Sequence, residues 1–215
     1  KQGRVPEARV DALVATLLDV TLRAEDARAG AASPAGPPAL SAPMQDAHHA
    51  LVREAAAASV VLLKNDASLL PLDAGRPRRV AVIGRFAKEP RYQGGGSSQM
   101  VPTRLESAWD ALVASAGSLV LSHAPGTGAN HQADAGALAE ARDAARDADV
   151  ALVFVGLPAS MENEGTDRPH MDLPAAHDAL LEAVAAVQPN LVVVVVAGAP
   201  VRLPFAERAG AIVLA

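Results

Sequence analysis

The chain has 215 residues, 50% of them hydrophobic but only 2% aromatic, and a formal net charge of −5. This length is enough for one sizeable core with an appendage. The acidic balance gives no electrostatic reason to expect nucleic acid or a membrane surface as partner, and the lack of cysteine excludes disulfides and thiolate metal sites. No apolar run reaches the roughly 18 residues of a membrane span. The compartment stays open, with the cytoplasm slightly favoured.

The first 44 residues differ in pattern from the rest. Residues 6–27 have helical periodicity, with a row of apolar side chains on one side. These side chains are Val10, Leu13, Val14, Leu17 and Leu18. Residues 28–44 are rich in Pro, Gly, Ala and Ser, which is typical of an extended linker. Since the chain starts without Met and stops on an apolar run, we interpret it as a fragment, with residues 1–27 as the last helix of a preceding domain.

From residue 45 to residue 215, apolar runs alternate with helical patterns. Strands are predicted over residues 78–84, 118–126, 149–156, 190–198 and 211–215. Helices are predicted over residues 45–65 (running into an apolar stretch), 104–117, 134–148 and 173–190, and a helix or turn over residues 200–210. This alternation predicts an α/β domain with a mostly parallel sheet, incomplete at its C-terminus. The strands are apolar almost throughout, so helices are expected on both faces.

Ligands of an open parallel sheet bind beyond the carboxyl ends of its strands. Two long polar loops follow such strand ends, at residues 85–103 and 157–172. Long structured loops in this position commonly carry function. These two loops are therefore the candidate carriers of function.

The first loop contains a glycine-rich stretch, "YQGGGSSQM". Glycines allow the backbone to approach a ligand closely, and the polar side chains around them suit a hydroxyl-rich ligand. Those side chains are Tyr92, Gln93, Ser97, Ser98 and Gln99. A flexible turn is the alternative interpretation. Nucleotide binding is disfavoured, because neither the Walker pattern nor the dinucleotide glycine spacing is present.

The second loop, "MENEGTDRPHMDLP", is acidic. Its Glu162 and Glu164 precede a glycine, Gly165, and an Asp167–Arg168 pair. One interpretation is a solvated loop whose shape the Asp–Arg pair holds. The other is a carboxyl whose pKa is raised by neighbouring carboxylates and partial burial, and which therefore donates a proton near neutral pH. In that case Gly165 turns the chain so that Glu164 points into a cleft.

The remaining candidates for chemistry are weak. No H-E-x-x-H motif occurs, and the adjacent His48 and His49 cannot form an i,i+4 metal pair. We interpret the other four histidines as structural or surface residues. They are His123, His131, His170 and His177. Neither serine of the glycine-rich loop lies in a G-x-S-x-G context.

Four segments together resemble the second domain of family 3 glycoside hydrolases of the β-glucosidase type. They occur in order as "REAAAASVVLLKNDASLLPL", "VAVIGRFA", "YQGGGSSQMVPT" and "ENEGTDRPHMDLP". Any one of them is a weak signal, whereas the ordered set is specific. The resemblance covers about residue 45 to the end, and residues 1–27 resemble the exit from the preceding domain.

The resemblance implies a retaining hydrolase built from two domains, without metal or organic cofactor. An N-terminal (β/α)-barrel carries the aspartate nucleophile, and an α/β sandwich, here residues 45–215, supplies the acid/base glutamate. The position of Glu164 matches the acid/base, with Glu162 as second candidate. Substrate-binding or supporting positions then fall on Tyr92, Gly95, Gly96, Ser97, Asp167 and Arg168. The expected partners are a carbohydrate substrate and the preceding barrel, which is missing from this chain.

Because the barrel is missing, we expect this chain alone to hydrolyse nothing. One alternative is a non-catalytic α/β module that binds a sugar or another ligand, with the same fold but no chemistry at Glu164. The other is a nucleotide-binding α/β protein, against which the missing phosphate-binding motifs count.

Overall fold

The computed structural model of the chain describes residues 5–30, 40–97 and 99–215. The chain divides into two compact units, residues 1–48 and 49–215. The first unit contains α1 (Glu7–Gly30), and α2 (Ala42–Ser59) begins in it. Helix therefore replaces both ends of the predicted linker, and residues 31–39 of that linker lie outside the described residues. The apolar side chains of α1 are exposed, Leu17 by 69%.

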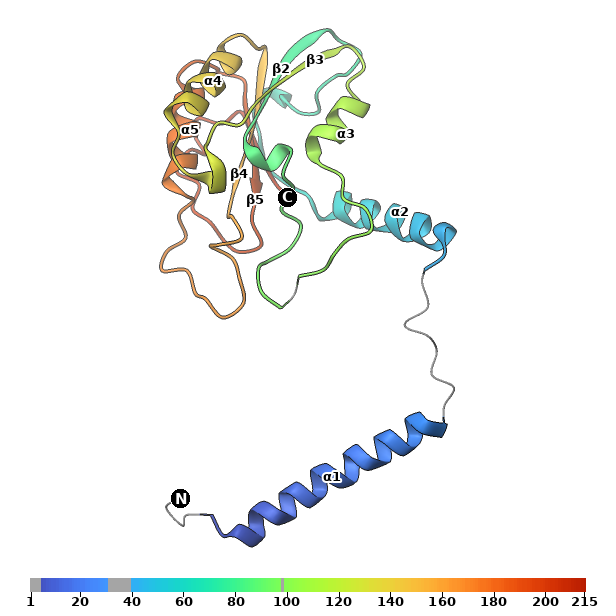
Figure 1. Cartoon of the computed structure of the whole chain (residues 1–215). Helices are drawn as coiled ribbons and strands as arrows, with labels where there is room; N and C mark the ends of the chain where they lie inside the picture. Colours follow the sequence, from blue (N-terminus) through green and yellow to red (C-terminus); the bar gives the residue numbers. More distant parts are fainter. Residues whose placement is uncertain (1–4, 31–39, 98) are drawn as a thin grey trace. The chain divides into compact units, whose positions relative to one another are not determined.

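The second unit is built on a six-stranded sheet in the order β1-β6-β5-β4-β2-β3 (Figure 1). Its strands are β1 (Val61–Asn65), β2 (Arg78–Ile83), β3 (Leu119–Ala124), β4 (Val150–Gly156), β5 (Leu191–Val196) and β6 (Ala211–Leu214). All neighbours pair in parallel except β1, which runs antiparallel to β6. The structure thus confirms the predicted α/β fold with a mostly parallel sheet.

Three helices connect the parallel strands. They are α3 (Ala108–Ala114), α4 (Ala135–Arg146) and α5 (Ala175–Ala185). Short 3-10 turns add η1 (Asp66–Ser68), η2 (Arg85–Ala87) and η3 (Ala129–His131). Ser107 caps the start of α3 and Asp134 the start of α4, because each side chain accepts a hydrogen bond from a backbone N–H of the first turn, at 3.0 and 2.9 Å. Helix α5 begins after Pro174, whose ring suits the start of a helix.

The sheet has a core on each face. One core packs α4 and α5 on one set of alternating strand residues, and the other packs α3 and η2 on the opposite set. Every residue of β4 is buried, as expected for a central strand covered on both sides. Edge strand β3 alternates instead, because only one of its faces is covered. Residues 204–208 form turns rather than a helix, and Phe205 anchors them in the first core.

Strand β2 is the point at which the chain reverses direction across the sheet. Helix α3 leads from β2 to β3 over one face, whereas α4 and α5 lead to β4 and β5 over the other (Figure 1). At such a switch point the loops after neighbouring strands diverge and leave a crevice. The glycine-rich and acidic loops follow β2 and β4, which are neighbours here. Among the described residues, no helix has the length and hydropathy to cross a membrane.

Candidate active site

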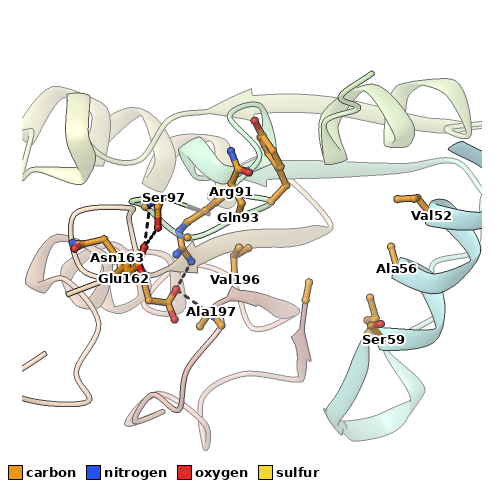
Figure 2. Close-up of a pocket in the computed structure, with 17 residues that line it drawn as sticks. Val52, Ala56, Ser59, Arg91, Gln93, Ser97, Glu162, Asn163, Val196 and Ala197 are labelled. Carbon is orange, nitrogen blue, oxygen red and sulfur yellow. Dashed lines mark hydrogen bonds and ion pairs between the residues drawn. The ribbon is translucent and has the colours of Figure 1, made fainter. Parts of the chain in front are cut away.

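A cleft of about 990 Å³ lies at the carboxyl edge of the sheet. It is lined by the glycine-rich loop, the acidic loop, residues 196–198 after β5, and one side of α2. Figure 2 shows Arg91, Gln93 and Ser97 of the first loop beside Glu162 and Asn163 of the second, with Val52, Ala56 and Ser59 of α2 across from them. The two loops that the sequence singled out as carriers of function thus meet at one cleft.

Backbone hydrogen bonds join the two loops directly. The Gly95 N–H donates to the Glu162 carbonyl at 3.0 Å, and the Glu164 N–H donates to the Gly95 carbonyl at 3.2 Å. The contact leaves no room for side chains, since a Cβ on Gly95 would lie 2.8 Å from Asn163 Cβ and one on Gly96 2.9 Å from Glu164 Cβ. In this structure the glycines thus allow the two loops to pack against each other.

Glu162 is held in place by an ion pair. Its Oε2 pairs with Arg91 Nη1, and the Gly198 N–H donates to the same oxygen at 3.3 Å. The two side chains are only 12% and 15% exposed, so water screens the pair weakly. Glu162 therefore ties together the loops that follow β2, β4 and β5.

Glu164 is exposed at the cleft and has a different partner. Both the hydroxyl and the backbone N–H of Ser97 donate to its Oε2, the N–H at 3.2 Å. The Ser97 hydroxyl, with a smaller contribution from its N–H, lowers the pKa of Glu164 below the usual value. The expectation of a raised pKa is therefore wrong for this chain, because hydrogen bonds to the ionised form outweigh burial.

The other predicted residues of the glycine-rich loop surround a closed turn. Gln93 accepts a hydrogen bond from the Met100 N–H at 2.7 Å and donates to its carbonyl at 3.1 Å, so these two residues are held together. Tyr92 is 49% exposed and lines the cleft. Ser98 lies outside the described residues.

Arg168 and Asp167 lie beyond the residues that line the cleft. Arg168 donates to the Pro200 carbonyl at 2.9 Å and so fixes the acidic loop to the segment after β5. Asp167 is exposed. Within the described part of the chain no ion pair joins the two, so the Asp–Arg brace does not form. Gly165 has φ +80°, as its predicted role in the turn requires.

Sequence reasoning missed three contributors to the cleft: Arg91, the Gly198 segment and α2. Arg91 carried a signal, since it directly precedes Tyr92 and faces a loop of opposite charge. The contribution of α2 carried none, because its apolar side chains look like ordinary core residues.

The Nε of Arg91 and the Nη1 of Arg168 are buried and, among the described residues, have no hydrogen-bond partner. Such donors suit oxygen-rich ligands or water.

A histidine pair contacts the end of β4, the strand that leads into the acidic loop. His177 is 2% exposed; its Nδ1 accepts from the Gly156 N–H at 3.3 Å and its Nε2 lies 3.0 Å from His131 Nδ1. The ring of His131 stacks on Phe86 at 4.2 Å between centroids. Burial, with His131 beside it, lowers the pKa of His177 to about 4. Both rings thus act as neutral packing groups at ordinary pH, in agreement with the structural interpretation.

No group of three or more His, Asp or Glu side chains within the described ranges could hold a metal ion.

The arrangement offers one carboxyl group for proton transfer. Glu162 is occupied by Arg91, whereas Glu164 is at the surface of the cleft with a single neutral partner. Neutral polar side chains and the Tyr92 ring line the same cleft. These groups are suited to a polar, uncharged ligand.

Comparisons with known proteins identify relatives of this chain. Thermostable β-glucosidase B of Acetivibrio thermocellus is 46% identical over 166 residues, which are 76% of this chain and 22% of that protein. The exo-α-(1->6)-L-arabinopyranosidase of Bifidobacterium longum is 45% identical over 173 residues, 76% of this chain and 23% of that protein. The chain thus spans less than a quarter of the length of these relatives.

Solved structures include relatives as well. The crystal structure of the Bifidobacterium adolescentis GH3 β-glucosidase superposes with a TM-score of 0.72 at 37% identity, over 99% of this chain and 30% of that one. The sequence model of the glycosyl hydrolase family 3 C-terminal domain matches residues 60–215. The resemblance noted from the ordered motifs is thereby confirmed, and the chain belongs to glycosyl hydrolase family 3, of which it carries the C-terminal domain.

Proposed function

We propose that this chain supplies the proton-transfer half of a retaining β-glycosidase, with Glu164 as acid/base. The observation that carries the proposal is the contrast between the two glutamates of the acidic loop. Glu164 is exposed at a cleft of about 990 Å³, whereas Glu162 is neutralised by Arg91. A carboxylate that must balance a poorly solvated arginine is a poor proton donor, because its protonation leaves that cation unpaired.

In the proposed mechanism Glu164 changes role between two steps. It first donates a proton to the glycosidic oxygen while a second carboxylate attacks the anomeric carbon and forms a glycosyl-enzyme. It then accepts a proton from the water that releases the sugar. The first step needs the acid form of Glu164 and the second the carboxylate.

The second carboxylate is proposed to come from a preceding barrel domain of the same protein. A retaining enzyme places its two carboxyl groups about 5 Å apart, and Glu162 is the only other acidic residue that lines the described part of the cleft. The length of the relatives leaves ample chain for such a domain. Residues 1–27 are proposed as its final helix, since the exposed apolar side of α1 needs a partner.

The proposed barrel domain also explains how Glu164 reaches its protonated form. In this chain Ser97 lowers the pKa of Glu164. A second carboxylate close by and the exclusion of water both raise the pKa of a carboxyl group. We infer that Glu164 becomes a proton donor only when the cleft is closed by the rest of the enzyme.

The substrate is proposed to be a terminal glycoside. Relatives named for β-glucosidase and α-L-arabinopyranosidase activity make aryl β-D-glucosides and aryl α-L-arabinopyranosides the first compounds to assay. The neutral donors and the Tyr92 ring at the cleft fit such hydroxyl-rich compounds.

The test is Glu164→Ala in the complete gene product. Natural disaccharides should lose much more activity than aryl glycosides, because a good leaving group needs little protonation; about 10²–10⁴-fold is typical for loss of an acid/base group. Azide should then restore turnover of the aryl substrate by occupying the vacated site as a nucleophile. The matched variant Glu162→Gln should show neither the substrate split nor the azide rescue.

Other outcomes have definite meanings. The split and the rescue appearing in Glu162→Gln instead would move the acid/base role to Glu162. Sugar binding without any hydrolysis by the complete gene product would support the non-catalytic binding module.

A further inference from the structure

Ser97 directs two donors at one oxygen of Glu164. Its hydroxyl and its backbone N–H both bond to Oε2, and among the described residues no donor bonds to Oε1. The two oxygens of this carboxyl group are therefore not equivalent. One is held by the protein, and the other is left for exchange with solvent or substrate.

The position of Ser97 is fixed by its own loop. Gln93 closes the loop on Met100 through two hydrogen bonds, and the Gln99 N–H donates to the Gly96 carbonyl at 3.3 Å. The bridge between Gly95 and Asn163 then attaches this loop to the residue next to Glu164. The serine and the glutamate thus belong to one hydrogen-bonded assembly.

We propose that Ser97 is a positioning residue that holds Oε2 of Glu164 in the carboxylate form and leaves Oε1 for proton transfer. This inference rests on the proposed acid/base role of Glu164. Donors to a carboxylate favour its ionised form. Ser97 therefore favours the step in which Glu164 acts as base, and sets the pH above which too little acid form remains for the first step.

Charged neighbours do not replace this effect. Glu162 and Arg91, which line the same cleft, pair with each other. Farther along the acidic loop Arg168 is bound to the Pro200 carbonyl and Asp167 points to solvent. None of these four is among the groups that perturb the Glu164 pKa, which Ser97 lowers.

The first measurement uses the 215-residue chain and needs no activity. The carboxyl carbon of Glu164 is titrated by NMR in the wild type, Ser97→Ala and Ser97→Thr. The midpoint should move to higher pH in Ser97→Ala, by only part of the full effect because the backbone N–H remains, and should return toward the wild-type value in Ser97→Thr. Ser115→Ala is the control, because that hydroxyl bonds to Ala111 within α3 at 2.7 Å. Thermal melts of each variant show that it is folded.

The second measurement is the pH dependence of kcat/KM of the complete gene product on an aryl glycoside. The basic limb, which reports the acid form of the proton donor, should move to higher pH in Ser97→Ala and stay in place in Ser97→Thr, while the acid limb is unchanged. An unmoved NMR midpoint in a folded Ser97→Ala chain overturns the inference. If the NMR midpoint moves but the basic limb does not, Ser97 does stabilise the carboxylate of Glu164, but Glu164 is not the proton donor.

Discussion

Glu162 and Glu164 lie two positions apart, yet only Glu162 is neutralised by Arg91. The turn at Gly165 and the backbone bridge to Gly95 present the two side chains to different partners. A single ion pair therefore separates a structural carboxylate from one that remains available for chemistry. At the residue scale, the site depends on which glutamate the arginine contacts.

The Arg91–Glu162 pair should be strongly coupled. Arg91→Met or Glu162→Gln alone should lower the free energy of unfolding by about 2–4 kcal/mol, because each leaves a largely buried charge without its partner. The double variant should cost less than the sum of the two, with a coupling energy of about 1–3 kcal/mol. Urea unfolding of the four proteins measures this. The exposed pair Arg146–Asp143 on α4, treated in the same way, should show no coupling.

His177 should make the fold sensitive to mild acid. Its pKa falls from about 6.5 in the unfolded chain to about 4 in the folded one. Between these values the unfolded state binds more protons. The contribution of His177 to the free energy of unfolding is thus fully present above about pH 6.5. It is lost at up to about 1.4 kcal/mol per pH unit as the pH falls toward 4.

Denaturant unfolding midpoints measured between pH 7 and pH 5 test whether the stability falls with acid as expected. His177→Gln should be less stable at pH 7, because the bonds to Gly156 and His131 are lost, but should show a smaller decline with acid. The exposed His170→Gln serves as the control and should keep the wild-type decline. Equal declines in wild type and His177→Gln would contradict the assignment to this residue.

At the scale of elements, the cleft depends on two loops that follow neighbouring strands and pack without side chains between them. The alternation of apolar runs and helical patterns was enough to predict the parallel strands, because strands covered on both faces, such as β4, must be apolar along their whole length. Strand β1 was missed, since the predicted helix at residues 45–65 included it. The same rule placed the glycine-rich and acidic loops at one edge.

The sequence could not predict which side chains pair with each other at this edge of the sheet. Arg91 pairs with Glu162, and Ser97 with Glu164, only because of the register between two loops that lie far apart in the chain. The lowered pKa of Glu164 was missed for the same reason. The prediction of a helix or turn at residues 200–210 left two alternatives open, and the structure has turns over residues 204–208.

Gly96 should tolerate alanine less well than Gly165 does. Both have positive φ, +95° and +80°, so both variants carry backbone strain of about 1–2 kcal/mol. Only at Gly96 does the new Cβ also collide, 2.9 Å from Glu164 Cβ, whereas none lies within 4 Å at Gly165. Gly96→Ala should therefore lower the free energy of unfolding more and separate the two loops. Comparison of the two variants by urea unfolding tests this, and equal losses would show that strain alone acts.

At the scale of the whole molecule, the chain alone should not hydrolyse glycosides. The described cleft contains one carboxyl group free for chemistry, and a retaining mechanism needs two. The purified 215-residue chain should release no nitrophenol from 4-nitrophenyl β-D-glucopyranoside above a buffer blank. Turnover that Glu164→Gln abolishes would show that the second carboxylate lies within this chain.

The pairing of β1 with β6 has a consequence for synthesis on the ribosome. Strand β1 is made first in the sheet, but its neighbour is the last strand, with Val61 opposite Leu214. Strands β2 to β5 can assemble in the order in which they emerge, since each pairs with a strand already made or made next. The nascent chain therefore carries the unpaired apolar strand β1 until residues 211–214 have been made, and slow elongation through residues 66–210 prolongs the period in which chaperones or other nascent chains have access to it.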